Sequence, residues 1–164
     1  MTMTVCLCRL PALLEARKAG LRVTLHGGEV PGRSEEAMQQ LAFHPDRLGH
    51  MCYMEDRVKE ALLASKIPLE LCLTSNIKTQ TFPCFQDHHF QEVFLAKHPL
   101  VLCTDDSGVF HTSLSQEFAI AMNTFGIQEK DVQRLVAESI DYTFASDAEK
   151  LELKRCLLPR LSQI

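Results

Sequence analysis

The stretch DRVKEALLASKIPLELCLTSN, residues 56–76, contains one complete helix–strand unit. Val58 and Leu62 fall on one face at helical spacing, which predicts a helix over Asp56–Lys66. The apolar run Pro68–Leu73 has the length of a buried strand, and polar residues follow it directly. A helix followed at once by a buried strand is typical of folds built on a parallel sheet.

The same unit recurs on both sides of this stretch. The predicted helices span Leu10–Gly20, Ser34–Leu41 and Asp56–Lys66, and the predicted strands span Leu21–His26, Arg47–His50, Pro68–Leu73 and Leu100–Thr104. Three more helices are predicted over Leu114–Phe125, Glu129–Phe144 and Asp147–Leu158. Repeated units of this kind are typical of a (β/α) barrel or of a doubly wound sheet.

Composition narrows the class of protein. The chain has 164 residues, of which 46% are hydrophobic and 23% charged, and this suits one soluble globular domain. No apolar run approaches the ~20 residues of a membrane-spanning helix, so we expect no membrane contact of that kind. The net charge of -4 gives no basic field for phosphate backbones, so we do not expect nucleic acid as a partner. The first residues lack the apolar core of a secretory signal, which favours a cytoplasmic protein.

The number and spacing of the cysteines also favour a cytoplasmic protein. The seven cysteines form an odd set without a C-x-x-C pair. This pattern indicates reduced thiols, and neither a disulfide framework nor a zinc ribbon is expected. Cys72 and Cys103 lie in apolar runs, where a free cysteine behaves as a small hydrophobic residue.

Polar side chains gather where each predicted strand ends. They are His26 with Glu29, His50, Ser75 with Asn76, and Asp105 with Asp106. Because the carboxyl ends of parallel strands meet at one edge of a sheet, we expect these residues to surround one site. Each group alone has a structural interpretation, since a lone histidine is commonly a satisfied core residue and two aspartates can open a turn. Four consecutive strands that end in this way favour a chemical site.

Four ordered motifs carry a family resemblance. They are Leu25-His26-Gly27-Gly28-Glu29, Asp46-Arg47-Leu48-Gly49-His50, Glu70-Leu71-Cys72-Leu73-Thr74-Ser75-Asn76 and Cys103-Thr104-Asp105-Asp106. In order and spacing they resemble the second half of the adenosine deaminase family of zinc barrels, and most closely its adenosine deaminase-like branch, whose members hydrolyse N6-methyl-AMP. The resemblance implies an α/β fold, a partial (β/α)8 TIM barrel of the metal-dependent hydrolase type, with strands five to eight and the C-terminal helices. Residues 10–164 would form this domain, after an atypical start at residues 1–9.

Carried over residue by residue, the resemblance implies a site for one zinc ion and a small purine nucleotide. His26 and Asp105 would be zinc ligands, and His50 would orient and help deprotonate the zinc-bound water. Glu29 would donate a proton to the purine ring, and Asp106 would hydrogen-bond the purine. Imidazole and carboxylate ligands suit catalytic zinc, which lowers the pKa of bound water to ~7. The implied reaction is hydrolysis of N6-methyl-AMP to IMP and methylamine.

The chain is shorter than the barrel that the family uses. An eight-stranded barrel takes ~250 residues, and the His-x-His pair that supplies two more zinc ligands in the family is absent from this sequence. We therefore expect a truncated form with an incomplete ligand set, inactive alone and prone to self-association through exposed sheet edges. The alternative is a non-catalytic half-barrel that acts only through association with another chain. A doubly wound nucleotide-binding domain ranks below both, because Gly27-Gly28 is too short a match to G-x-G-x-x-G.

Some residues depart from the family pattern. The family commonly has alanine or a larger residue where Gly27 stands, and glycine where Met51 stands. Met51 is therefore expected to crowd the rim or to redirect His50. The tandem pair His88-His89 and the pre-proline His98 have no family counterpart, and such histidines usually face solvent or support a loop.

Overall fold

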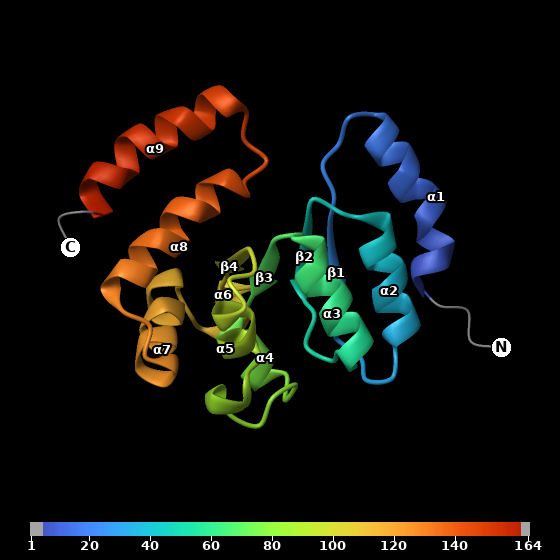
Figure 1. Cartoon of the computed structure of the whole chain (residues 1–164), viewed down its shortest axis with the longest axis horizontal. Helices are drawn as coiled ribbons and strands as arrows, with labels where there is room; N and C mark the ends of the chain where they lie inside the picture. Colours follow the sequence, from blue (N-terminus) through green and yellow to red (C-terminus); the bar gives the residue numbers. More distant parts are fainter. Residues whose placement is uncertain (1–4, 162–164) are drawn as a thin grey trace.

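The computed structural model describes residues 5–161, which form a parallel sheet with helices packed beside it (Figure 1). The four strands lie in chain order, β1-β2-β3-β4. The elements are α1 (Val5–Lys18), β1 (Thr24–Gly27), α2 (Ser34–Phe43), β2 (Arg47–His50), α3 (Asp56–Ser65), β3 (Leu69–Leu71), α4 (Leu73–Lys78), the 3-10 turn η1 (Phe85–Asp87), α5 (Phe90–Leu95), β4 (Leu100–Leu102), α6 (Ser107–Phe110), α7 (Leu114–Phe125), α8 (Glu129–Asp141) and α9 (Asp147–Leu161). This order confirms the predicted alternation of strands and helices.

One face of the sheet is apolar and carries the core. Leu48, Leu69 and Leu100 lie side by side in the parallel register, and each is at most 1% exposed. They form a single hydrophobic cluster with helix residues, among them Val58 of α3 and Phe90 of α5. The helices after the first three strands therefore pack against this face, and burial of these side chains holds the sheet and helices together.

The other face of the sheet is polar. Arg47 of β2 forms an ion pair with Glu70 of β3, and their side chains are only 19% and 17% exposed. Arg47 also donates to the carbonyl oxygen of Tyr142 at 2.8 Å and lies 3.8 Å above the ring of Phe144. The connector between α8 and α9 thus covers part of this face. A doubly wound sheet has helices on both faces, so the arrangement is that of a barrel wall.

Several predicted boundaries shift. Helix α1 begins at Val5, five residues earlier than predicted, while residues 1–4 of the expected atypical start lie outside the described part of the chain. Strand β3 ends at Leu71, and α4 begins two residues later. Thr74, Ser75 and Asn76 therefore belong to a short helix and do not end a strand. Helix α5 has no counterpart among the predicted elements.

Met51 lies in the core, and the expectation that it crowds the rim is wrong. Its side chain is fully buried in the main hydrophobic cluster, and its φ is 50°. A Cβ atom added at Gly27 would meet Gln40 Oε1 at 2.1 Å and Met51 Sδ at 2.8 Å. Glycine at position 27 therefore leaves the space that these two buried side chains occupy.

Replacing Gly27 with alanine should destabilise the fold by about 1–3 kcal/mol, because the added methyl group overpacks this space. Adding Met51→Gly should make the combined loss smaller than the sum of the single losses, since the sulfur is removed and glycine suits a left-handed backbone. Urea unfolding midpoints measure both changes. Gly108→Ala is the matched control, because nothing lies within 4 Å of the added atom. Equal losses at positions 27 and 108 would contradict this packing.

Candidate functional site

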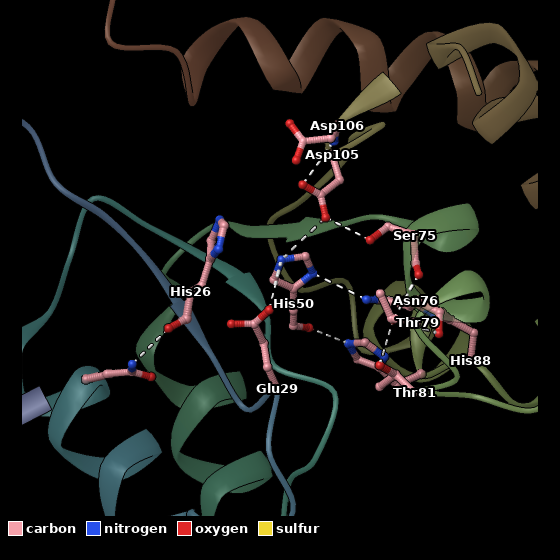
Figure 2. Close-up of polar contacts among 12 residues, drawn as sticks. His26, Glu29, His50, Ser75, Asn76, Thr79, Thr81, His88, Asp105 and Asp106 are labelled. Atoms are coloured by element: carbon pink, nitrogen blue, oxygen red, sulfur yellow. Dashed lines mark hydrogen bonds and ion pairs between the residues drawn. The ribbon is translucent and has the colours of Figure 1, made fainter. Parts of the chain in front are cut away.

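The five residues to which the family resemblance gives a role lie at the carboxyl ends of three strands (Figure 2). His26 lies in β1 with Glu29 just after it, His50 ends β2, and Asp105 and Asp106 follow β4. Because all strand pairs are parallel, these ends belong to one edge of the sheet.

His50 is the residue that joins the others. Its Nε2 atom is 3.7 Å from Glu29 Oε1 and 3.9 Å from Asp105 Oδ2. Its ring meets the ring of His26 edge-on, with centroids 4.7 Å apart and an interplanar angle of 79°. Asp106 is exposed, and Figure 2 shows its carboxylate directed away from His50. Four of the five predicted residues are thus brought together, and Asp106 borders the group.

Two neighbours place His26. The side-chain amide of Gln40 donates from Nε2 to the main-chain oxygen of His26 at 2.9 Å. A Cβ atom at Gly49, the residue paired with His26 in β2, would come within 2.6 Å of His26 Cδ2. Glycine at position 49 therefore allows the imidazole to lie across the neighbouring strand and to reach His50.

The backbone at the rim is strained. His50, Met51 and Asp105 have φ values of 64°, 50° and 57°, which non-glycine residues adopt at a cost of ~1–3 kcal/mol each in such sites. Alternation along β2 would direct the side chain at position 50 to the same face as Leu48. The left-handed turn at His50 instead brings its ring beside His26, whose strand position belongs to the polar face. Such strain is characteristic of functional sites.

The Asp105 carboxylate is held by two donors. Ser75 in α4 donates its hydroxyl to Oδ2 at 2.7 Å, and the main-chain N–H of Asp106 donates to Oδ1 at 3.0 Å. Both oxygens are engaged, so the plane of the carboxylate is set. Ser75 was expected at a strand end, and it reaches Asp105 from the first residues of a helix instead.

The three histidines expected either to face solvent or to support a loop are buried. His88, His89 and His98 are 2%, 9% and 4% exposed. His88 Nε2 lies 3.0 Å from Asn76 Oδ1, and His89 Nε2 contacts the main-chain oxygen of His50 at 2.8 Å. Of the two expectations, solvent exposure is wrong for all three. His88 and His89 are buried because the segment before α5 folds under the rim, and His98, which follows α5, contacts the main-chain oxygen of Ile67 at 2.8 Å.

Electrostatics distinguish the possible ligands. Burial lowers the pKa of His50 below its ordinary value, and the Glu29 carboxylate opposes only part of that effect. The pKa of the Cys72 thiol is raised by its hydrogen bond with Cys103 and by burial. Cys72 therefore remains a protonated thiol, and it is less suited than the imidazoles and carboxylates to hold a metal.

Among residues 5–161, two groups each contain three possible ligand atoms that lie within 4.8 Å of one another. One contains His26, Glu29 and His50, and the other contains His50, Cys72 and Asp105. The groups share His50 but separate the two predicted zinc ligands. Their imidazole and carboxylate atoms are of the type that zinc accepts.

The recess directly beside His26 and Glu29 is small for a nucleotide. A recess of about 70 Å³ lies against His26 and Glu29, whereas ligand pockets commonly reach ~300–1,000 Å³. A larger cavity of about 500 Å³ lies beside Pro99. Pro99 precedes β4, so that cavity lies at the opposite end of the strand from Asp105 and does not involve the site.

Comparison with known proteins places these features in context. The sequence model of the family described as adenosine deaminase matches residues 8–158. The N6-mAMP deaminase of Arabidopsis thaliana is 46% identical over 145 residues, which cover 88% of this chain and 41% of that protein. The N6-methyl-AMP deaminase of Homo sapiens is 44% identical over 152 residues, 89% of this chain and 43% of that protein. The crystal structure of Arabidopsis ADAL complexed with IMP matches with a TM-score of 0.89 and 44% identity, over 94% of this chain and 45% of that chain. The chain therefore spans less than half the length of these relatives.

Proposed function

The chain belongs to the adenosine deaminase family, and from this premise we propose that it carries part of a zinc-dependent deaminase site. The proposed reaction is hydrolysis of N6-methyl-AMP to IMP and methylamine. Relatives described as N6-methyl-AMP deaminases support this substrate. The IMP in the ADAL complex also supports it, since IMP is the product of this reaction.

The observation that carries the proposal is the position of His50 between two carboxylates and a second imidazole. Within this group we assign His26 and Asp105 as zinc ligands. Asp105 fits that role because its carboxylate is already held by donors on both oxygens. Zinc, when bound, supplies a Lewis acid and lowers the pKa of a bound water to ~7.

Glu29 is the proposed proton donor. Addition of water oxygen to the ring carbon that bears the methylamino group is favoured when the adjacent ring nitrogen gains a proton. The proton from Glu29 stays on that nitrogen in IMP, and the carbon–nitrogen bond to the amine breaks. Of the two hydrogens of the water, one restores the proton on Glu29 and the other leaves on methylamine. The Glu29 side chain is 52% exposed, so a substrate can reach it. Asp106 is proposed to hydrogen-bond the purine.

The alternative is a non-catalytic half-barrel that associates with another chain. Within the part of the chain that the structure describes, β1 and β4 each pair with one strand only. Their outer edges carry main-chain N–H and C=O groups that another strand can pair with. The same edges would support self-association. This alternative predicts assembly without a contribution of Glu29 to turnover.

The chain alone should hold zinc weakly. Catalytic zinc generally has three protein ligands and a water, and we assign only two here. If each ligand contributes a few kcal/mol, the loss of two should cost several powers of ten in affinity, at about 1.4 kcal/mol per decade. Metal analysis of the dialysed, untagged protein should find well under one zinc per chain. His44→Ala, in an exposed residue after α2, serves as the control for His26→Ala. Stoichiometric zinc that is lost only with His26→Ala would show that these residues suffice.

We propose a cytoplasmic location on the basis of the cysteines. No helix in residues 5–161 is both long enough and apolar enough to cross a membrane. The cysteines described as free are Cys52, Cys72, Cys84, Cys103 and Cys156. Free thiols persist where the compartment is reducing, which supports this location.

A further inference from the structure

A buried chain of hydrogen bonds runs from the start of α5 to the ring of His50. Figure 2 draws the three side chains of this chain, His88, Asn76 and His50. The main-chain N–H of Phe90 donates to His88 Nδ1 at 3.0 Å. His88 Nε2 lies 3.0 Å from Asn76 Oδ1, and Asn76 Nδ2 lies 3.3 Å from His50 Nδ1. His88, Asn76 and His50 are 2%, 4% and 4% exposed, so bulk water does not compete for these groups.

The direction of every bond in this chain follows from Phe90. Its main-chain N–H can only donate, so His88 Nδ1 accepts. A neutral imidazole that accepts at Nδ1 carries its proton on Nε2. Burial lowers the pKa of His88 to about 2, which keeps this ring neutral. His88 Nε2 therefore donates to Asn76 Oδ1, and the amide nitrogen of Asn76 is left facing His50 Nδ1.

The opposite orientation of the Asn76 amide is excluded by the same reasoning. Amide orientation must ordinarily be assigned from the hydrogen-bond network. A flipped Asn76 would set its NH2 group against the protonated Nε2 of His88. Two buried donors would then face each other, and leaving them unsatisfied costs ~1–3 kcal/mol. Asn76 thus donates to His50 Nδ1, which must be unprotonated.

The rim side of the His50 ring supports the same proton position independently. Nε2 faces carboxylate oxygens of Glu29 and Asp105 at 3.7 and 3.9 Å. When no proton is held on Glu29, both groups are acceptors, so an N–H at Nε2 is attracted to them, whereas a lone pair would be repelled.

We propose that Asn76 and His88 are positioning residues that hold the neutral His50 ring with its proton on Nε2, so that His50 presents a hydrogen-bond donor to the space between Glu29 and Asp105. In this form Nε2 has no free lone pair and cannot accept a proton from water. The family resemblance implied such a base role for His50. A fixed donor at this point instead stabilises an oxygen that gains negative charge. That catalytic meaning rests on the proposed function, while the proton position does not.

Nitrogen NMR of the full 164-residue chain, labelled with ¹⁵N in its histidine rings, tests the proton position directly. The spectrum distinguishes protonated from unprotonated ring nitrogens, and His50→Gln identifies the His50 signals by their loss. At a pH where the ring is neutral, the Nε2–H form should exceed the Nδ1–H form by more than about tenfold, which corresponds to ~1.4 kcal/mol. A proton that resides mainly on Nδ1 would overturn the proposal.

Asn76→Asp tests whether the chain of hydrogen bonds sets this preference. An ionised carboxylate only accepts, so Nδ1 of His50 should become protonated in this variant. His89→Gln is the matched control, because His89 contacts the main-chain oxygen of His50 and not its ring, and the tautomer should be unchanged. If Nδ1 stays unprotonated in folded Asn76→Asp, Asn76 does not position the proton. If that variant does not fold, the unsubstituted chain decides the proposal by itself.

The outcome is separable from that of the proposed function. A chain with the expected tautomer that never supports deamination, even within a complete barrel, would refute the function and leave the positioning roles of Asn76 and His88. A complete barrel that is active on N6-methyl-AMP but carries the proton of His50 on Nδ1 would support the function and refute the positioning roles of Asn76 and His88.

Discussion

Joined to the upstream part of the Arabidopsis N6-mAMP deaminase, this chain should hydrolyse N6-methyl-AMP, and Glu29→Gln in the joined protein should lower kcat roughly 10²–10⁴-fold. Glutamine keeps the size and the hydrogen bonding of Glu29 but has no proton to transfer. The substitution therefore tests proton donation and leaves the fold intact, since the side chain is half exposed. The reaction can be measured by the change in ultraviolet absorbance as N6-methyl-AMP is converted to IMP.

The control for this variant is Glu35→Gln. Glu35 is an exposed carboxylate of α2 that pairs with Arg57, so its removal should leave kcat unchanged. The 164-residue chain alone should show no measurable turnover. The recess at His26 and Glu29 holds only about 70 Å³, and only two residues are assigned as zinc ligands, whereas catalytic zinc generally has three. Turnover by the chain alone would show that the site needs nothing more. A Glu29→Gln barrel as fast as its parent would show that the acid is another residue.

Most of the fold could be predicted from the sequence, because the spacing of apolar residues within each helix–strand unit indicates the structure of that unit. Asp56–Ser65 forms a helix with Val58 and Leu62 buried, as their spacing predicted. The superposition on the IMP complex over 45% of that chain confirms the partial (β/α)8 barrel. The local pattern alone fits both a barrel and a doubly wound sheet, and the family resemblance favoured the barrel. The Arg47–Glu70 ion pair, on the face opposite the core helices, agrees with that choice.

The element boundaries that failed are those that tertiary packing sets. Leu71 and Leu73 are both fully buried, so an apolar run alone does not show that the strand ends between them. Phe90 and Val93 of α5 are buried at a spacing of three residues, but one turn of spacing in a six-residue helix is too short a pattern to distinguish from a loop.

Some residues of the candidate site could be predicted from the sequence, and others could not because tertiary packing positions them. Strand ends in a parallel sheet gather at one edge, so His26, His50 and Asp105 were identifiable as neighbours from their positions along the chain. The contact of His88 with Asn76 has no periodic signature, since it depends on how the segment before α5 folds under the rim. The apolar residues around it, such as Phe90, were the available signal that His88 is buried. The left-handed turn at His50 was likewise not encoded in any local pattern.

In the joined protein, Asp105→Ala should remove zinc, while Asp106→Ala should retain it. Asp105 faces His50 and is held by two donors, whereas the carboxylate of Asp106 turns away from His50 (Figure 2). If a ligand is worth about 4 kcal/mol, Asp105→Ala should cost roughly three powers of ten in zinc affinity. Asp106→Ala should leave one zinc per chain and lower kcat/KM for N6-methyl-AMP roughly 10–100-fold, the value of a hydrogen bond from a charged group.

Ser75→Ala should give a zinc affinity between those of Asp105→Ala and Asp106→Ala. It removes the hydroxyl that donates to Asp105 Oδ2 but leaves the carboxylate, so zinc affinity should fall by only about 10–100-fold, as for other groups that orient a ligand. Competition with a chelator of known affinity measures all three variants on one scale. The expected order is Asp105→Ala weakest, Ser75→Ala intermediate and Asp106→Ala unchanged. Equal zinc loss with Asp105→Ala and Asp106→Ala, or full zinc retention with Asp105→Ala, would contradict the assignment of Asp105 as the ligand, because the two residues are adjacent in sequence and differ only in where their carboxylates point.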